Sequence, residues 1–117
     1  MGKETSRRRV EAVLADVEEA AAAAAELVAR GKTAWDEDGL LRLAGEAIIG
    51  RIADAAGRLP EGIRSAVDDV PWDDIRDIRI LVDHIYHRID YAILWRTLEE
   101  DVPHLRSRLR DYREAES

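Results

Sequence analysis

The residues with the clearest chemical potential lie in one short stretch, where an arginine, a histidine and a tyrosine follow one another closely. Arg79 carries a permanent positive charge, His84 has an imidazole that titrates near neutral pH, and Tyr86 has a phenol. An imidazole can move protons, and a guanidinium can stabilise negative charge that develops on a phosphate. This combination is typical of sites that cleave phosphodiesters.

A helix through this stretch would present two adjacent stripes of side chains. The apolar stripe consists of Ile75, Ile78, Val82 and Ile85. The polar stripe, about 100° further round, consists of Arg76, Arg79, Asp83 and Tyr86. Arg79 and His84 are separated by five positions, and their directions on a straight helix therefore differ by about 140°. They can act on one phosphate only if the helix loosens near His84 or if two chains share a site.

Simpler interpretations of the same residues stay open. Arg79 can pair with Asp83 one helical turn away, which would leave His84 as a hydrogen-bonded imidazole at a helix end. Tyr86 can be a partly buried aromatic residue at the same end. Asp83, His84 and His87 could also share a metal ion, but the stretch offers no further firm ligand.

The stretch resembles a known family. Arg79, His84 and Tyr86 form the pattern R-x4-H-x-Y, which is the signature of HepT-like toxins in the HEPN superfamily. The flanks are similar as well, and the residues that agree are Pro71, Trp72, Asp90, Trp95 and the run Glu-Asp-Val-Pro-His-Leu at 100–105. The resemblance covers mainly positions 72–105.

The resemblance implies a small all-helical ribonuclease that acts as a homodimer, needs no metal or other cofactor, and is encoded beside a nucleotidyltransferase antitoxin. It implies that His84 is the acid/base and Arg79 the phosphate clamp, and that the antitoxin attaches AMP to Tyr86. Arg76 and Arg88 become candidates for holding the RNA backbone, although each could equally pair with an acid. Two further positions qualify this picture: Ile80 stands where the family usually has a polar residue, and Asp83 could orient the imidazole.

The whole chain sets further limits. Its 117 residues predict a single HEPN-like domain, 1–117, with a real hydrophobic core. It has no cysteine, and no apolar run is long enough to cross a membrane, so we expect a soluble, cytoplasmic protein. The net charge is −7, so a bound nucleic acid would need a local concentration of arginines.

The pattern of apolar residues predicts an all-α fold, a four-helix bundle with one additional short helical turn. The expected elements are a helix at 6–30 with Ser6 as N-cap, a helix from the acids at 36–38 to Leu59, a short turn at 61–67, a helix capped by Asp69, and a last helix capped by Asp90 with a break near Pro103. Gly31 should end the first helix. Gly45 and Gly50 suggest a close crossing of helices, since glycine inside a helix costs about 1 kcal/mol relative to alanine.

Two carboxylates in the second long helix could also do chemistry. Glu46 and Asp54 are eight positions apart, and they could form a metal or acid/base site. The alternative is a salt bridge to Arg76 or Arg79, because an unpaired buried carboxylate is costly. The functional rival to a ribonuclease is a non-catalytic helical subunit that dimerises and docks a nucleotidyltransferase. The acidic net charge and Ile80 favour this rival, whereas Arg79, His84 and Tyr86 favour the toxin.

Overall fold

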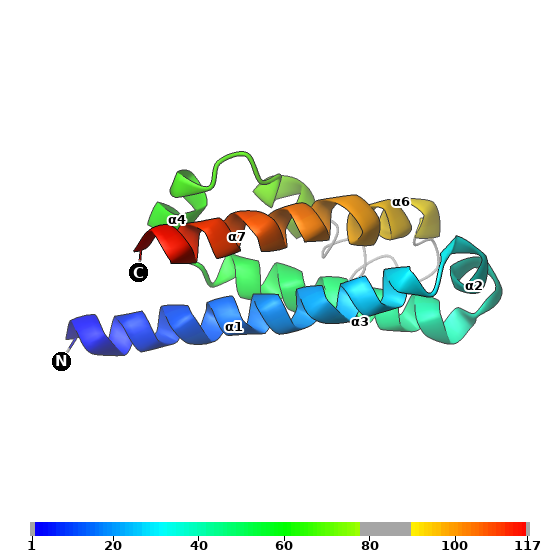
Figure 1. The fold of residues 1–117 in the computed structure, drawn as a ribbon, viewed down its shortest axis with the longest axis horizontal. Helices are drawn as coiled ribbons and strands as arrows, with labels where there is room; N and C mark the ends of the chain where they lie inside the picture. Colours follow the sequence, from blue (N-terminus) through cyan, green and yellow to red (C-terminus); the bar gives the residue numbers. More distant parts are fainter. Residues whose placement is uncertain (1, 78–89, 117) are drawn as a thin grey trace.

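The computed structural model describes residues 2–77 and 90–116, with side chains from residue 6 onward, and this part of the chain is helical without any strand. The elements are α1 (Gly2–Ala29), α2 (Lys32–Glu37), α3 (Gly39–Gly57), α4 (Glu61–Ala66), a helical stretch at 72–77, α6 (Tyr91–Arg96), a π-helix η1 (Thr97–Asp101) and α7 (Val102–Glu116) (Figure 1). The predicted all-α fold is confirmed.

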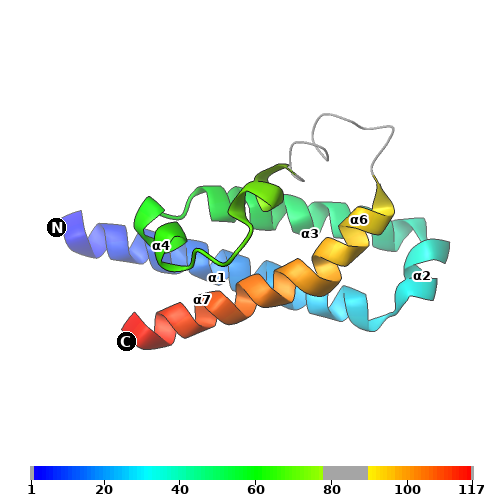
Figure 2. The same cartoon turned by 90° about the horizontal axis from the view of Figure 1, so that it is seen from above.

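Three long rods build the molecule, which measures 49 × 28 × 23 Å. Helices α1 and α3 run antiparallel as a hairpin, with α2 in the connection between them (Figure 1). The continuous rod of α6, η1 and α7 crosses this hairpin, while α4 lies near the end where the termini are found (Figure 2). The fully buried residues at the centre come from all three rods, and they include Val17, Ile49, Ile52, Leu94, Leu98 and Leu105. No helix among the described residues is long and apolar enough to span a bilayer.

The first helix ends as predicted but begins earlier. Gly31 has φ 94°, a left-handed conformation that glycine adopts without strain, and it follows the last turn of α1. Ser6 is not an N-cap, because α1 starts at Gly2 and Ser6 lies inside it. The alanine-rich sequence that follows is a strong helix former.

The connector to α3 is itself helical. In α2, Trp35 is 1% exposed, and its side chain anchors the polar stretch 32–37 to the core. Asp38 then caps α3, with its carboxylate accepting a hydrogen bond of 2.9 Å from the backbone N–H of Leu40. The predicted acidic N-terminus of this helix is therefore confirmed at Asp38.

Asp69 does not cap the next helix, as the sequence had suggested. Its carboxylate instead accepts a hydrogen bond of 3.0 Å from Arg108 Nε of α7, and it also lies 3.5 Å from His104 Nε2. The helical stretch begins at Trp72, directly after Pro71. The carboxylate of Asp69 therefore pairs with α7 and does not cap the helical stretch that begins at Trp72.

The last rod follows its predicted signals. Asp90 caps α6 by accepting hydrogen bonds from the N–H groups of Ala92 and Ile93, at 3.0 and 3.2 Å. The predicted break near Pro103 appears as η1, one turn of π-helix that precedes α7. A π-turn interrupts the i→i−4 ladder, and here it lies directly upstream of Pro103, a residue that has no N–H to donate to that ladder.

Ion pairs fasten α7 to α1. Glu18 contacts Arg106 Nη2 at 2.9 Å and also Arg110. Glu11 contacts Arg113 Nη2 at 2.9 Å. The arginines beside Glu18 hold the pKa of that carboxyl below its usual value, although partial burial opposes them.

Candidate active site

Most of the predicted site lies outside the described residues. Arg79, Asp83, His84 and Tyr86 all fall within positions 78–89, so their roles stay predictions. The described structure gives the two flanks of this segment, which end at Asp77 and begin again at Asp90. These flanks determine where the segment starts and where it returns.

The upstream flank is anchored by apolar and aromatic side chains. Val70 and Ile75 are each 4% exposed, and the indole N–H of Trp72 donates a hydrogen bond of 3.0 Å to the carbonyl of Val67. Arg76 is the predicted site residue that the structure does describe. Its side chain is 66% exposed, and its Nη2 lies 3.7 Å from Asp73 and 3.5 Å from Asp77. These are loose surface contacts, longer than the 2.7–2.9 Å of a strong charge-assisted hydrogen bond.

The downstream flank is anchored by a cluster of polar and aromatic residues that follows Asp90. Tyr91 donates its phenol hydrogen bond to Glu46 Oε2 at 3.1 Å. The guanidinium of Arg42 lies 5.5 Å from the centre of the Tyr91 ring, and it also donates hydrogen bonds of 2.8 Å to the carbonyls of Trp35 and Asp36. Burial, together with the carboxylate of Glu46, raises the pKa of Tyr91.

Trp35 ties this cluster to the core. Its ring meets that of Tyr91 edge-on at 6.1 Å between centroids, and that of Trp95 at 5.4 Å. Sequence reasoning did not assign a site role to Trp35 or Tyr91. Two signals pointed to them: a tryptophan in an otherwise polar connector, and a tyrosine directly after a predicted N-cap.

The two carboxylates of α3 do not act together. Glu46 accepts the hydrogen bond from Tyr91, whereas Asp54 lies 3.4 Å from Arg58 Nε. The described contacts of Arg76 are with acids on its own helical stretch, so the predicted bridge from Arg76 to α3 is not among them. A bridge to Arg79 lies outside the described residues. Within residues 6–77 and 90–116, no three ligating side chains are grouped to hold a metal ion.

One acid beside the upstream flank has an altered titration. Asp101, in η1, is partly buried, and this burial raises its pKa. The neighbouring carboxylates of Glu100 and Asp74 raise it further, while the positive charge of Arg96 lowers it. The raised pKa shows that the folded protein disfavours the ionised form of Asp101.

Exposed apolar side chains are found on the first half of α3 and on α6. Leu40 is 76% exposed and Leu43 is 60% exposed, both in the first half of α3, and Ile93 of α6 is 44% exposed. Ala44 and Ala47 continue the exposed face of α3. Adjacent exposed leucines on one helix face are typical of a surface that another molecule covers.

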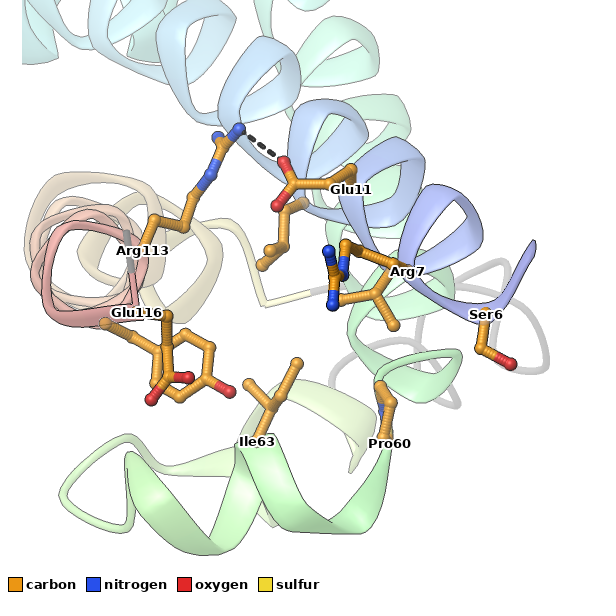
Figure 3. Close-up of a pocket in the computed structure, with 10 residues that line it drawn as sticks. Ser6, Arg7, Glu11, Pro60, Ile63, Arg113 and Glu116 are labelled. Carbon is orange, nitrogen blue, oxygen red and sulfur yellow. Dashed lines mark hydrogen bonds and ion pairs between the residues drawn. The ribbon is translucent and has the colours of Figure 1, made fainter. Parts of the chain in front are cut away.

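A hollow of about 860 Å³ among the described residues is lined by side chains from both ends of the chain and by Pro60 and Ile63. It is formed by the ends of α1 and α7 together with α4 (Figure 3). Pro60 and Ile63 lie on one side, and the ion pair between Glu11 and Arg113 lies on another. None of the residues that line it falls between positions 64 and 111, so it is separate from both flanks of the motif.

The comparison with known proteins identifies the chain's family. The sequence model of the family "Ribonuclease HepT-like" matches residues 17–111, and the chain therefore belongs to this family. The predicted relationship to HepT-like HEPN proteins is thereby confirmed.

Individual relatives agree with this result. A protein of Thermococcus cleftensis named "Probable ribonuclease HepT" is 27% identical over 62 residues, which cover 53% of this chain and 56% of that protein. A "Putative RNase" of Methanocaldococcus jannaschii is 33% identical over 55 residues, 47% of this chain and 50% of that protein. A third, from Caldanaerobacter subterraneus and also named "Putative RNase", is 30% identical over 60 residues, 51% of this chain and 54% of that protein. The chain spans about half the length of the curated relatives it matches. No solved structure matches it significantly.

Proposed function

We propose that this chain is a metal-independent endoribonuclease and the toxin of a toxin–antitoxin pair. The observation that carries the proposal is the R-x4-H-x-Y pattern of Arg79, His84 and Tyr86 in a chain that belongs to the Ribonuclease HepT-like family. The relatives named as ribonucleases support RNA as the substrate. Residues 1–117 act as one HEPN-like domain in the cytoplasm.

The chemistry requires few groups. His84 takes the proton from a ribose 2′-hydroxyl, and the 2′-oxygen attacks the neighbouring phosphorus. The bond from phosphorus to the 5′-oxygen breaks, and an imidazolium returns a proton to this leaving group. The guanidinium of Arg79 stabilises the charge on the phosphorane oxygens. Asp83 orients the imidazole, and Arg76 holds the adjacent RNA backbone.

The active unit is a homodimer in which each subunit contributes one Arg79–His84 pair. Two copies related by a two-fold axis would bring two such pairs to a shared site, which removes the difficulty that Arg79 and His84 diverge on a straight helix. The exposed leucines at 40 and 43 support this arrangement, because burying each would stabilise the dimer by about 1.5–3 kcal/mol.

The partner is a nucleotidyltransferase antitoxin that transfers AMP to Tyr86. The phenol oxygen attacks the α-phosphorus of ATP, the phenol loses its proton and pyrophosphate leaves. The added group brings negative charge and bulk next to Arg79, and it therefore prevents RNA from binding. Mass spectrometry after co-expression tests this step: the wild-type chain should gain the mass of AMP, and Tyr86→Phe should not. An unmodified wild-type chain beside a demonstrably active antitoxin would contradict the step.

Expression in growing cells tests the toxin itself. The wild-type chain should arrest growth, and His84→Ala should relieve the arrest at equal protein level. His104→Ala is a matched control, because His104 is a histidine of α7 that is 44% exposed and lies outside the R-x4-H-x-Y pattern. Arrest that persists in His84→Ala would refute the catalytic role of His84.

A second candidate function is a non-catalytic helical subunit that dimerises and docks a nucleotidyltransferase. The net charge of −7 and the apolar Ile80 favour it, since both weaken RNA binding. Under this alternative the wild-type chain still forms a dimer and still binds the antitoxin, but it neither arrests growth nor cleaves RNA.

A further inference from the structure

A small hollow borders the upstream flank of the motif. It has a volume of about 270 Å³, and it is lined by α3, by α4 and by the helical stretch at 72–77. Its small-residue wall is formed by Ala53, Ala56 and Gly57 of α3. Its charged wall contains two guanidinium groups, those of Arg64 and Arg76, and one carboxylate, that of Asp73. In a chain with a net charge of −7, this lining has an excess of positive charge.

The two guanidinium groups differ in how accessible they are. The Arg64 side chain is 35% exposed and its Nη2 contacts Glu61 at 3.1 Å, while its Nε is buried and has no hydrogen-bond partner, the one such buried side-chain nitrogen or oxygen among the described residues. A buried donor without a partner is rare in folded proteins. Arg76 is exposed, and its nearest carboxylate oxygens are 3.5 and 3.7 Å away. Arg76 thus keeps exposed N–H donors that are well suited to a phosphate oxygen, and Arg64 adds a second positive charge to the lining of the same hollow.

An aromatic wall completes the hollow. The indole N–H of Trp72 donates to the carbonyl of Val67, which fixes the ring at the border of the hollow while leaving the residue partly exposed. A fixed indole beside cationic groups is the combination with which proteins hold single-stranded nucleic acid, since the ring stacks on a base and the cations bind the backbone. The hollow therefore has the chemistry to hold a nucleotide unit.

We propose that this hollow, formed by Arg64, Trp72 and Arg76, is a subsite that binds a backbone phosphate of the RNA strand next to the cleavage site. The proposal rests on the ribonuclease function proposed above. Arg76 precedes Arg79 by three positions, and three residues of chain span at most about 11 Å. A strand held by Arg79 would thus reach this hollow with a neighbouring nucleotide. The strand, rather than free phosphate, is the ligand because the indole offers a surface that inorganic phosphate would not use.

Binding of a short single-stranded RNA with 2′-O-methyl riboses, which the enzyme cannot cleave, tests the subsite. Arg76→Gln and Arg64→Gln should each weaken binding by about five- to tenfold, and each should reduce the slope of log affinity against log salt by about 0.7. Arg51→Gln is the matched control, since Arg51 is an exposed arginine of α3 that lines a different hollow. Arg76→Gln is the safer test of the two, because the Arg76 side chain is 66% exposed and its replacement should leave the fold intact.

The indole N–H resonances give an independent readout. The chain has three tryptophans, and Trp35 and Trp95 are 1% and 7% exposed, so only the Trp72 resonance should shift markedly when the RNA is added. Equal weakening by Arg51→Gln and Arg76→Gln would overturn the subsite, as would a Trp72 resonance that moves with inorganic phosphate but not with the strand. A wild-type protein that binds the strand through Arg64 and Arg76 but cleaves no RNA would support the subsite and refute the proposed nuclease. A protein that cleaves RNA with KM unchanged in both variants would retain the nuclease and refute the subsite.

Discussion

Replacing Gly45 by alanine should destabilise the protein, although alanine is the better helix former. A Cβ atom at this position would lie 2.7 Å from two ring atoms of Trp35 and 3.1 Å from Cδ1 of Leu98. A Cβ atom cannot lie 2.7 Å from a ring carbon, so the Trp35 ring or the backbone of α3 would have to move. Trp35 cannot move cheaply, since it is 1% exposed and is held between the rings of Tyr91 and Trp95.

The magnitude follows from two opposing terms. Overpacking a well-packed core costs about 1–3 kcal/mol, while replacing glycine by alanine inside a helix gains about 1 kcal/mol. We expect the first term to exceed the second, so that Gly45→Ala loses about 1 kcal/mol of folding free energy. Gly57→Ala is the matched control in the same helix, because a Cβ there meets nothing within 4 Å. Because Gly57 is the last residue of α3, where helix propensity counts less than in the interior, Gly57→Ala should gain at most about 0.5 kcal/mol.

Urea denaturation at one fixed protein concentration measures the difference. With a slope of about 1–3 kcal/mol per molar urea for a small protein, the two midpoints should be about 1 M apart, with Gly45→Ala the lower. Tryptophan fluorescence should also change in folded Gly45→Ala, since Trp35 must shift. If Gly45→Ala is as stable as Gly57→Ala, the reasoning from the contact with Trp35 is refuted.

Three further substitutions test the electrostatics and the exposed leucines. Glu18→Gln should lower the free energy of unfolding by about 1 kcal/mol at pH 7. Because pairing with the arginines lowers the pKa of Glu18, this loss should fade in thermal unfolding as the pH falls below 4.5. A loss that persists in acid would contradict the ion-pair account. Asp101→Asn should have the opposite sign, since burial raises the pKa of Asp101: the variant should be more stable than wild type at pH 7 and equal to it below pH 3.8. A destabilised Asp101→Asn at neutral pH would show that the carboxylate makes a favourable contact there. Leu43→Glu should convert the proposed dimer to a monomer in analytical ultracentrifugation, whereas Ala15→Glu, on the exposed side of α1, should leave it dimeric. A dimer that survives Leu43→Glu would place the interface elsewhere.

Local signals in the sequence predicted much of the helical architecture. Gly31 and Asp90 ended and began helices as predicted, because each fulfils a backbone requirement that a few neighbouring residues decide. The prediction that Asp69 caps a helix was wrong because its contacts are with residues far away in the sequence. Its partners, Arg108 and His104, are 39 and 35 positions away, and no local pattern reveals that such an ion pair will compete with a cap.

The glycines of α3 show the same division. Neither glycine shows the predicted close crossing of backbones: at Gly45 the close neighbours are the side chains of Trp35 and Leu98, and at Gly50 a Cβ would meet nothing within 4 Å in one chain. The difference depends on where Trp35 packs, and this is a tertiary fact. In the candidate site, the roles of the motif residues rest on the family resemblance and stay predictions, since these residues lie outside the described ones. The contact of Glu46 with Tyr91 joins positions 45 apart and was found only in the structure.

Cleavage of a defined oligoribonucleotide by the purified protein, in the presence of a chelator, tests the central claim most directly. The wild-type protein should cut the RNA with EDTA present, and its products should carry 2′,3′-cyclic phosphate and 5′-hydroxyl ends. Substituting deoxyribose at the cleavage position, or alanine for His84, should abolish the reaction. Cleavage that survives in His84→Ala, or that EDTA stops, would contradict a metal-independent imidazole mechanism.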